Sequence, residues 1–248
     1  MHRFFVPPEQ INLSSPWVSG QEARHLTKVM RMKTGDRVIL FDNTNREYAA
    51  RISDIIGDKV YFTIEDQKTM VRESNLRISL GLPLIRHQPF EWILQKGTEL
   101  GVAAFHPFYS GRSRRDFGKM EAAGKRARWE RIIIEAAKQC ERNVLPELNE
   151  PIPFDQLIAQ DLGELKIIPY EQEASRTLAE LEWTGSLQNP VCAMVGPEGG
   201  FRKEEIEQAR EKGFITVSLG PRILRSETAT LALVCLLQYR WGDMGQRR

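Results

Sequence analysis

The sequence predicts an α/β protein with a small β-barrel at its N-terminus. In the first seventy residues, short runs rich in β-branched and aromatic residues alternate with Gly, Asn and Asp, which is typical of a barrel. Beyond residue 75, strand-like and helix-like segments alternate, which predicts a largely parallel sheet. A chain of 248 residues suits one large or two modest domains, and we expect domains at 1–72 and 73–248.

The N-terminal domain is expected to contain one helix and several strands. Residues 22–32 have helical periodicity, and the stop signal lies near Gly35. Strands are expected at 38–41, 48–52 and 60–64, with turns between them. The polar segment 65–75 is expected to be a linker.

The second domain is expected to alternate strands with helices. Pro89 suits the first position of a helix, and Gly101 suits its C-terminal cap. The last helix, from Ser226 through Trp241, is apolar on nearly every side, so it should be buried inside the domain or against another chain. Strands are expected at 76–83, 103–108, 166–169, 191–195 and 215–219, and helices at 119–140 and from about residues 175 and 203.

Composition excludes several classes of protein. No apolar run approaches the roughly 18 residues that a membrane span needs, and the N-terminus does not resemble a secretory signal. The three cysteines are far apart and form no CxxC pair, and the four histidines show no ligand spacing. We therefore expect a cytoplasmic protein with no membrane partner and no metal.

Charge is distributed unevenly along the chain. Residues 111–142 hold ten Lys or Arg against five acidic residues, whereas residues 143–185 hold two against nine. This asymmetry suits one surface that faces a polyanion such as nucleic acid. A solvated helix followed by a solvated acidic loop explains the same pattern.

Two loops follow predicted strands at the edge where open α/β sheets bind their ligands. The first, 195–201, carries three glycines, which allow close approach of a ligand to the backbone. It lacks the nucleotide-phosphate fingerprints, and an ordinary tight turn would also explain it. In the second, 219–230, Arg225 and Glu227 are either functional groups or a local ion pair, and Ser226 suits an N-cap.

The order of three motifs resembles one family. KGTELG at 96–101, GPEGGF at 196–201 and LGPRILRSETA at 219–229 resemble the motifs of SPOUT-class RNA methyltransferases, and within that class the RsmE family. HRFFV at 2–6 and HLTKVMR at 25–31 are similar to that family's PUA-like barrel. The resemblance implies a trefoil-knotted C-terminal SPOUT domain and methylation of N3 of a uridine in 16S ribosomal RNA of the small subunit.

The resemblance also implies site residues. Arg225 would stabilise developing negative charge, and Glu227 or Glu198 would accept the proton. S-adenosylmethionine, the implied cofactor, would contact Ile168, Pro169, Tyr170, Gly196, Glu198, Gly199, Leu219, Gly220, Ile223, Leu224 and Thr228. The residues expected to bind RNA are Arg3, Arg24, Lys28, Arg31, Lys33, Arg112, Arg114, Arg115 and Arg222.

Three other functions compete with this one. A SPOUT methyltransferase that acts on another RNA site would share all of these motifs. A nicotinamide-dependent dehydrogenase is disfavoured by the missing fingerprint. A non-catalytic RNA-binding chaperone would use only the barrel and the basic helix. The all-apolar last helix and the SPOUT resemblance together predict a homodimer.

Overall fold

The computed structural model describes residues 1–11, 14–113, 119–183 and 190–245. The chain forms two compact units. The first unit contains Met1–Glu73 together with Ala137–Leu145, and the second contains Ser74–Ala136 together with Pro146–Arg248. The end of one helix therefore belongs to the N-terminal unit. The predicted division into 1–72 and 73–248 stays a prediction.

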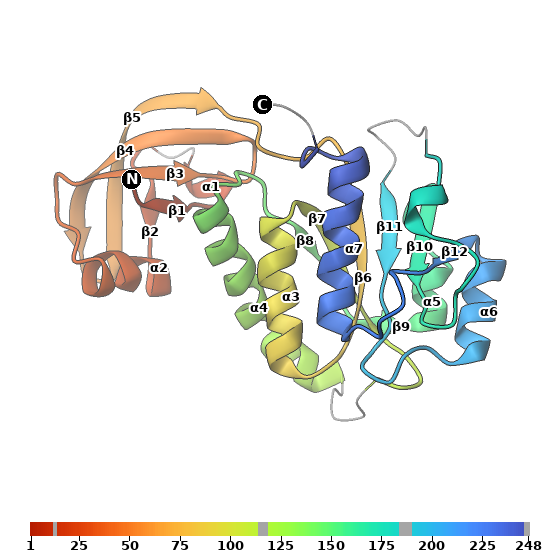
Figure 1. The fold of residues 1–248 in the computed structure, drawn as a ribbon. Helices are drawn as coiled ribbons and strands as arrows, with labels where there is room; N and C mark the ends of the chain where they lie inside the picture. The colour runs from red at the N-terminus through yellow and green to blue at the C-terminus, as the bar shows by residue number, and fades with distance from the viewer. Residues whose placement is uncertain (12–13, 114–118, 184–189, 246–248) are drawn as a thin grey trace. The chain divides into compact units, whose positions relative to one another are not determined.

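The first unit is a β-sheet in the order β1-β3-β4-β5-β2 (Figure 1). β1 runs parallel to β3, and the other neighbours are antiparallel. Along β4 buried and less buried residues alternate, so one face supplies the core with Phe4, Leu40 and Phe62. The strands are β1 (Arg3–Phe5), β2 (Trp17–Val18), β3 (Arg37–Phe41), β4 (Arg46–Ile56) and β5 (Lys59–Thr69).

Two predictions for this unit were wrong in part. The expected linker begins too early, because β5 continues to Thr69 by backbone pairing with β4 even though its last residues are polar and exposed. The expected helix 22–32 is instead α2 (Gly20–Arg24) followed by the π-helix η1 (His25–Val29). It ends before Arg31, which has a positive φ of 56°. The short helix α1 (Pro8–Ile11) gave no clear signal in the sequence.

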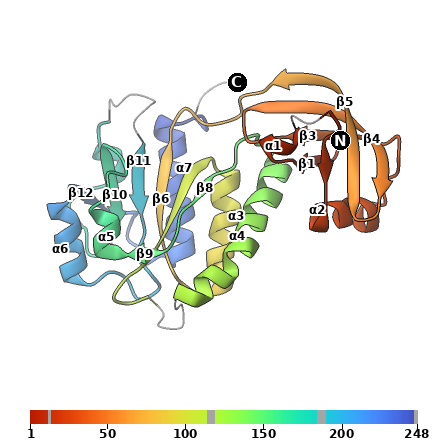
Figure 2. The ribbon, with the colours of Figure 1, turned by 180° about the vertical axis from the view of Figure 1, so that it is seen from behind.

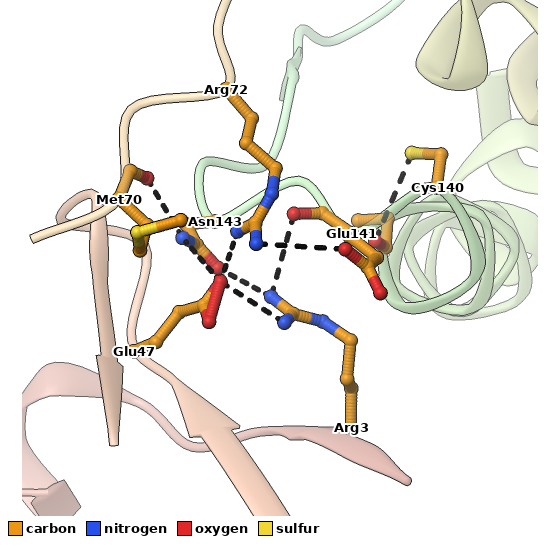
Figure 3. A network of polar contacts seen from close by, with 8 residues as sticks. Arg3, Glu47, Met70, Arg72, Cys140, Glu141 and Asn143 are labelled. Atoms are coloured by element: carbon orange, nitrogen blue, oxygen red, sulfur yellow. Dashed lines mark hydrogen bonds and ion pairs between the residues drawn. The ribbon is translucent and has the colours of Figure 1, made fainter. Parts of the chain in front are cut away.

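A buried polar network holds the residues after α4 in the first unit (Figure 3). The Glu47 carboxylate accepts hydrogen bonds from Arg3 at 3.1 Å and from Arg72. Arg3 also donates to the Asn143 side-chain oxygen at 2.5 Å, and Asn143 is fully buried. Burial raises the pKa of Glu47, but hydrogen bonds from Arg72 and Arg3 outweigh it and hold that pKa below its ordinary value. The network therefore needs an ionised Glu47.

The second unit is a parallel sheet in the order β12-β10-β11-β6-β7-β8, with β9 beside β7. Figures 1 and 2 show α3 and α7 on one face and α5 and α6 on the other. The strands are β6 (Ile78–Pro83), β7 (Val102–Tyr109), β8 (Glu147–Leu148), β9 (Ile152–Pro153), β10 (Leu165–Pro169), β11 (Val191–Met194) and β12 (Phe214–Val217). The helices are α3 (His87–Glu99), α4 (Lys119–Cys140), α5 (Phe154–Ile158), α6 (Lys203–Glu211) and α7 (Ser226–Trp241).

Three helix predictions for this unit need correction. α3 begins at His87, so Pro89 is its third residue. The helix expected from residue 175 is only a single 3₁₀ turn, η2 (Leu178–Glu180), because the Thr177–Glu180 hydrogen bonds close one turn and Leu181 is already extended. Ser226 is not the N-cap of α7, since Arg225 holds that position with extended backbone.

Helix α7 buries one face within its own unit and leaves the other open. Its buried side chains recur at helical spacing and include Leu233, Val234 and Leu237. On the other face Leu236 is 43% exposed and Tyr239 is 69% exposed. Burial of α7 on nearly every side inside the domain is therefore wrong, whereas burial of its open face against another chain stays a prediction.

Two kinds of feature are absent from residues 1–11, 14–113, 119–183 and 190–245. None of the helices there is long and apolar enough to cross a membrane. The same residues include no group of three or more His, Cys, Asp or Glu side chains that could hold a metal ion.

Candidate active site

The carboxyl ends of β10, β11 and β12 lie at one edge of the sheet. β10 pairs in parallel with both other strands, so the loops that follow Pro169, Met194 and Val217 emerge side by side. They enclose a cavity of about 690 Å³, a size typical of small-molecule sites. The lining comes from 169–171, 173–174, 195–201, 218–224, Ser226 and Ala229. Each segment belongs to the second unit.

Most of the predicted cofactor residues line this cavity. They are Pro169, Tyr170, Gly196, Glu198, Gly199, Leu219, Gly220, Ile223 and Leu224. Ile168 does not line it, because its side chain points into the core and is 0% exposed. Thr228 is exposed on α7 and is also absent from the lining. The structure thus brings the two predicted loops together and places these two residues elsewhere.

The two loops are joined directly by a hydrogen bond. The Ser226 hydroxyl, on a side chain that is 5% exposed, donates to the Gly196 carbonyl oxygen at 2.7 Å. Within the first loop, the Gly200 amide donates to the Pro197 carbonyl at 2.8 Å, which closes a tight turn. In the second loop, Gly220 has a φ of +101°, a conformation that only glycine adopts readily. The cavity wall therefore depends on backbone geometry.

Sequence reasoning missed the acidic side of the cavity. Glu171 and Glu173 line it together with the predicted Glu198, whereas Arg222 is the cation of the lining. Glu198 lies 3.6 Å from the Arg86 guanidinium. The position of Glu171 and Glu173 in the sequence could have indicated this side of the cavity, because residues 171–174 closely follow β10 at the same edge of the sheet. Three carboxylates therefore line one side of the cavity.

Glu173 is held in its ionised form by its neighbours. Its carboxylate accepts hydrogen bonds from the Ser175 hydroxyl at 2.6 Å and from the Thr216 hydroxyl at 2.5 Å. The Ser175 amide and Arg210 add to these. The hydrogen bonds from Ser175 and then Thr216 lower the pKa of Glu173 from 4.5 to about 2. Glu173 is therefore an anion at neutral pH.

The free energy of unfolding is expected to fall in acid as the Glu173 carboxylate becomes protonated. Because the folded pKa is depressed to about 2, the stabilisation is complete above pH 4.5 and is lost as the pH falls toward 2. Glu173→Gln should lower the free energy of unfolding at neutral pH by roughly 1 to 3 kcal/mol. It should also make that free energy fall less steeply as the pH drops below 4.5. Urea unfolding at pH 7 and at pH 3 measures both, with Glu171→Gln as the control. An unchanged acid decline in Glu173→Gln would contradict this role.

Arg225 and Glu227 are not paired with each other. Among the described residues no ion pair or hydrogen bond involves the Arg225 side chain, which is exposed at the start of α7. Glu227 is half-buried in the first turn of α7, and neither residue is part of the cavity lining. The local ion pair that the sequence left open is therefore absent, and the Arg225 guanidinium is available to a ligand.

The predicted RNA-binding residues fall into three groups. Arg24, Lys28, Arg31 and Lys33 are exposed on the first unit, and Arg112 and Arg222 are exposed on the second. Arg3 is only 8% exposed, since its guanidinium is engaged by Glu47 and Asn143, and we leave it out of the proposed RNA surface. Arg114 and Arg115 lie outside the described residues.

Comparisons with known proteins agree with this architecture. A family model described as an RNA methyltransferase domain matches residues 72–238, and one described as an RNA methyltransferase PUA domain matches residues 18–65. The ribosomal RNA small subunit methyltransferase E of Bacillus subtilis is 33% identical over 97% of both chains. The chain belongs to the RsmE family of RNA methyltransferases.

Two solved structures extend the RsmE comparison to the fold. A putative methyltransferase from Legionella pneumophila, in complex with S-adenosylmethionine, matches with a TM-score of 0.90 and 34% identity over 98% of each chain. The small subunit methyltransferase E of Neisseria gonorrhoeae, also bound to S-adenosylmethionine, matches with a TM-score of 0.88 and 32% identity, covering 98% of this chain and 99% of that one. The predicted α/β methyltransferase domain with a PUA-like domain is confirmed. The trefoil knot stays a prediction.

Proposed function

We propose that this RsmE-family protein transfers a methyl group from S-adenosylmethionine to N3 of a uridine in 16S ribosomal RNA of the small subunit. The observation that carries the proposal is the cavity at the carboxyl edge of β10, β11 and β12, walled by the two motif loops. Relatives that match over nearly the whole chain hold this cofactor. The cavity is the candidate cofactor site.

The lining fits S-adenosylmethionine chemically. Gly196, Gly199 and Gly220 leave backbone groups open to a flat adenine with a hydrogen-bonding edge, and Leu219 and Leu224 supply apolar contacts. The acidic side of the cavity complements the positive charge of a sulfonium ion. A dehydrogenase would instead need a pyrophosphate-binding loop, which this chain lacks.

Arg225 and a glutamate would perform the chemistry. When bound, S-adenosylmethionine supplies an electrophilic methyl group. The N3 atom of uracil is protonated at neutral pH, so a carboxylate must accept that proton as the new N–C bond forms. Glu198 and Glu227 are the two candidates for this carboxylate. Glu198 is favoured because it lines the cavity. The unpaired Arg225 guanidinium would stabilise the negative charge that spreads onto O2 and O4 of the base.

A second copy of this chain is the proposed partner of α7. The open face of α7 is apolar, and Ile223, which lines the cavity, is 89% exposed. A partner helix that covered this face would also shelter Ile223 and complete each active site. We propose a cytoplasmic homodimer that acts on ribosomal RNA. The exposed cations of each unit would contact phosphates.

The backbone of the second loop gives a specific test of the cofactor site. Gly220→Ala places a side chain at a φ of +101°, which costs about 1 to 2 kcal/mol of folding stability. Gly213→Ala is the matched control, because Gly213 also has a positive φ, +84°, and open space, but lies outside the lining. Both variants should melt at lower temperature, whereas only Gly220→Ala should weaken S-adenosylmethionine binding, by about tenfold. Equal affinities in calorimetry would contradict the assignment.

Equilibrium binding of labelled S-adenosylmethionine tests the function class. We expect saturable binding by the purified protein and competition by S-adenosylhomocysteine. A dehydrogenase or an RNA-binding chaperone would bind neither, and that result would overturn the proposal.

A further inference from the structure

A buried carboxylate next to the candidate active site has no role in the mechanism above. Glu205 lies in the first turn of α6 and is 9% exposed. One of its oxygens, Oε2, accepts a hydrogen bond from the Arg202 amide at 2.7 Å, as an ordinary capping residue would. The other, Oε1, accepts from the Gly111 amide at 2.7 Å, although Gly111 lies 94 positions earlier in the chain. Glu205 thus joins α6 to the loop after β7.

Arg202 also forms a hydrogen bond with Gly111. Its guanidinium donates to the Gly111 carbonyl oxygen at 2.9 Å, so both backbone polar groups of Gly111 are bonded to the start of α6. A Cβ atom on residue 111 would lie 2.6 Å from the Arg202 guanidinium carbon, a distance that real contacts do not reach. A side chain at position 111 would therefore push the Arg202 guanidinium away from the Gly111 carbonyl oxygen.

The next residue connects the same loop to the cofactor loop. The Arg112 guanidinium donates to the Gly199 carbonyl oxygen at 2.7 Å. A turn closed by Ser110 and Ser113, whose amide and carbonyl groups are bonded at 3.0 Å, keeps Gly111 and Arg112 in this arrangement. Residues 110–113 are consequently fastened to α6 on one side and to the proposed S-adenosylmethionine site on the other.

A second hollow adjoins the cofactor cavity at this junction. Tyr170, Glu171 and Phe201 line both. The second hollow is also lined by Arg112, Arg202 and Lys203, three cations of the kind that contact RNA phosphates, beside the carboxylates of Glu171 and Glu204. Two of these cations, Arg112 and Arg202, also make the hydrogen bonds that fasten the loop. RNA bound to Arg112 and Arg202 would therefore contact the residues that connect the 110–113 turn to the cofactor loop.

We propose that Glu205 is a positioning residue that couples RNA binding to cofactor binding. By fixing the Gly111 amide, it holds Arg112 against Gly199, so that each ligand favours the arrangement that the other needs. This inference rests on the proposed function. It adds that the affinity for one ligand rises when the other is bound, by the same factor in both directions.

The test compares cofactor affinity with and without RNA. S-adenosylhomocysteine, which has no methyl group to transfer, is titrated into the protein alone and into its complex with unmethylated small ribosomal subunits. We expect the subunits to raise the affinity of the wild-type protein by about tenfold. Glu205→Gln should reduce that factor to about one, because glutamine has a single acceptor oxygen and its NH₂ group would face one of the two amides. Glu207→Gln, an exposed change on the same helix, is the control.

A second variant changes the contact between Gly111 and Arg202 by a substitution in the 110–113 turn, and it leaves the sequence of α6 unchanged. Gly111→Ala should displace the Arg202 guanidinium from the Gly111 carbonyl oxygen and lower the coupling factor. If either folded variant kept the wild-type coupling factor, or if the wild-type protein showed none, the positioning role would be wrong. Absence of any S-adenosylhomocysteine binding by the wild-type protein would instead overturn the proposed function, and the inference with it.

Discussion

Replacing Arg225 by alanine is expected to slow methyl transfer by about a hundredfold, the loss typical of a missing oxyanion donor. The Arg225 side chain has no partner among the described residues, so its removal breaks no contact that holds the fold. Affinity for S-adenosylmethionine and for the small subunit should stay largely intact, because the proposed charge develops only in the transition state. Single-turnover kinetics with unmethylated small subunits measures the rate directly.

The control for this change is Arg77→Ala, which removes another exposed arginine of the same unit that does not line the cavity. It should leave the rate unchanged. Thermal unfolding of each sample shows whether a lost rate reflects lost structure. A folded, cofactor-binding Arg225→Ala protein with the wild-type rate would remove the catalytic role.

Introducing a charge on the open face of α7 is expected to abolish activity. Leu236 is 43% exposed in one chain, so Leu236→Glu should be tolerated by the isolated subunit. In the proposed dimer the same carboxylate would be buried against an apolar partner helix, which costs several kcal/mol. We therefore expect the variant to sediment as a folded 28.5 kDa species, whereas the wild-type protein sediments at twice that mass.

Leu236→Met conserves the volume and polarity of the side chain and is the matched control. It should remain dimeric and active. A wild-type protein that is monomeric at micromolar concentration, or a monomeric Leu236→Glu protein with full activity, would rule out the proposed completion of the site by a partner.

Much of the fold could be predicted because the strands have a clear apolar signature. β10, β11 and β12 are short apolar runs bounded by Gly, Pro and charged residues, and the expected ranges differ from the observed ones by one or two residues. The end of β5 was missed because its polar side chains hide a strand that is held only by backbone pairing with β4. The helix expected from residue 175 failed because a local Thr177–Glu180 cap closes a single turn.

The candidate site was predicted where its loops carry unusual residues. The glycines of 195–201 and the segment 219–224 marked two walls of the cavity, whereas Arg225 and Glu227 lie outside its lining. Glu171 and Glu173 were missed because acidic residues in a loop carry no motif, and only the parallel register of β10 and β12 places them at the cavity. Arg3 was assigned to RNA because sequence alone does not show that Glu47 and Asn143 enclose it.

Mapping of methylated uridines in 16S ribosomal RNA by mass spectrometry tests the proposed methylation of N3. Small subunits from a strain that lacks this protein would be incubated with the purified protein and S-adenosylmethionine, and then digested to nucleosides and oligonucleotides. We expect one uridine to gain a methyl group on N3 with the wild-type protein and to gain it about a hundredfold more slowly with Arg225→Ala. A methyl group found only on a ribose, on carbon 5 or on another base, or on no nucleotide at all, would contradict the proposal.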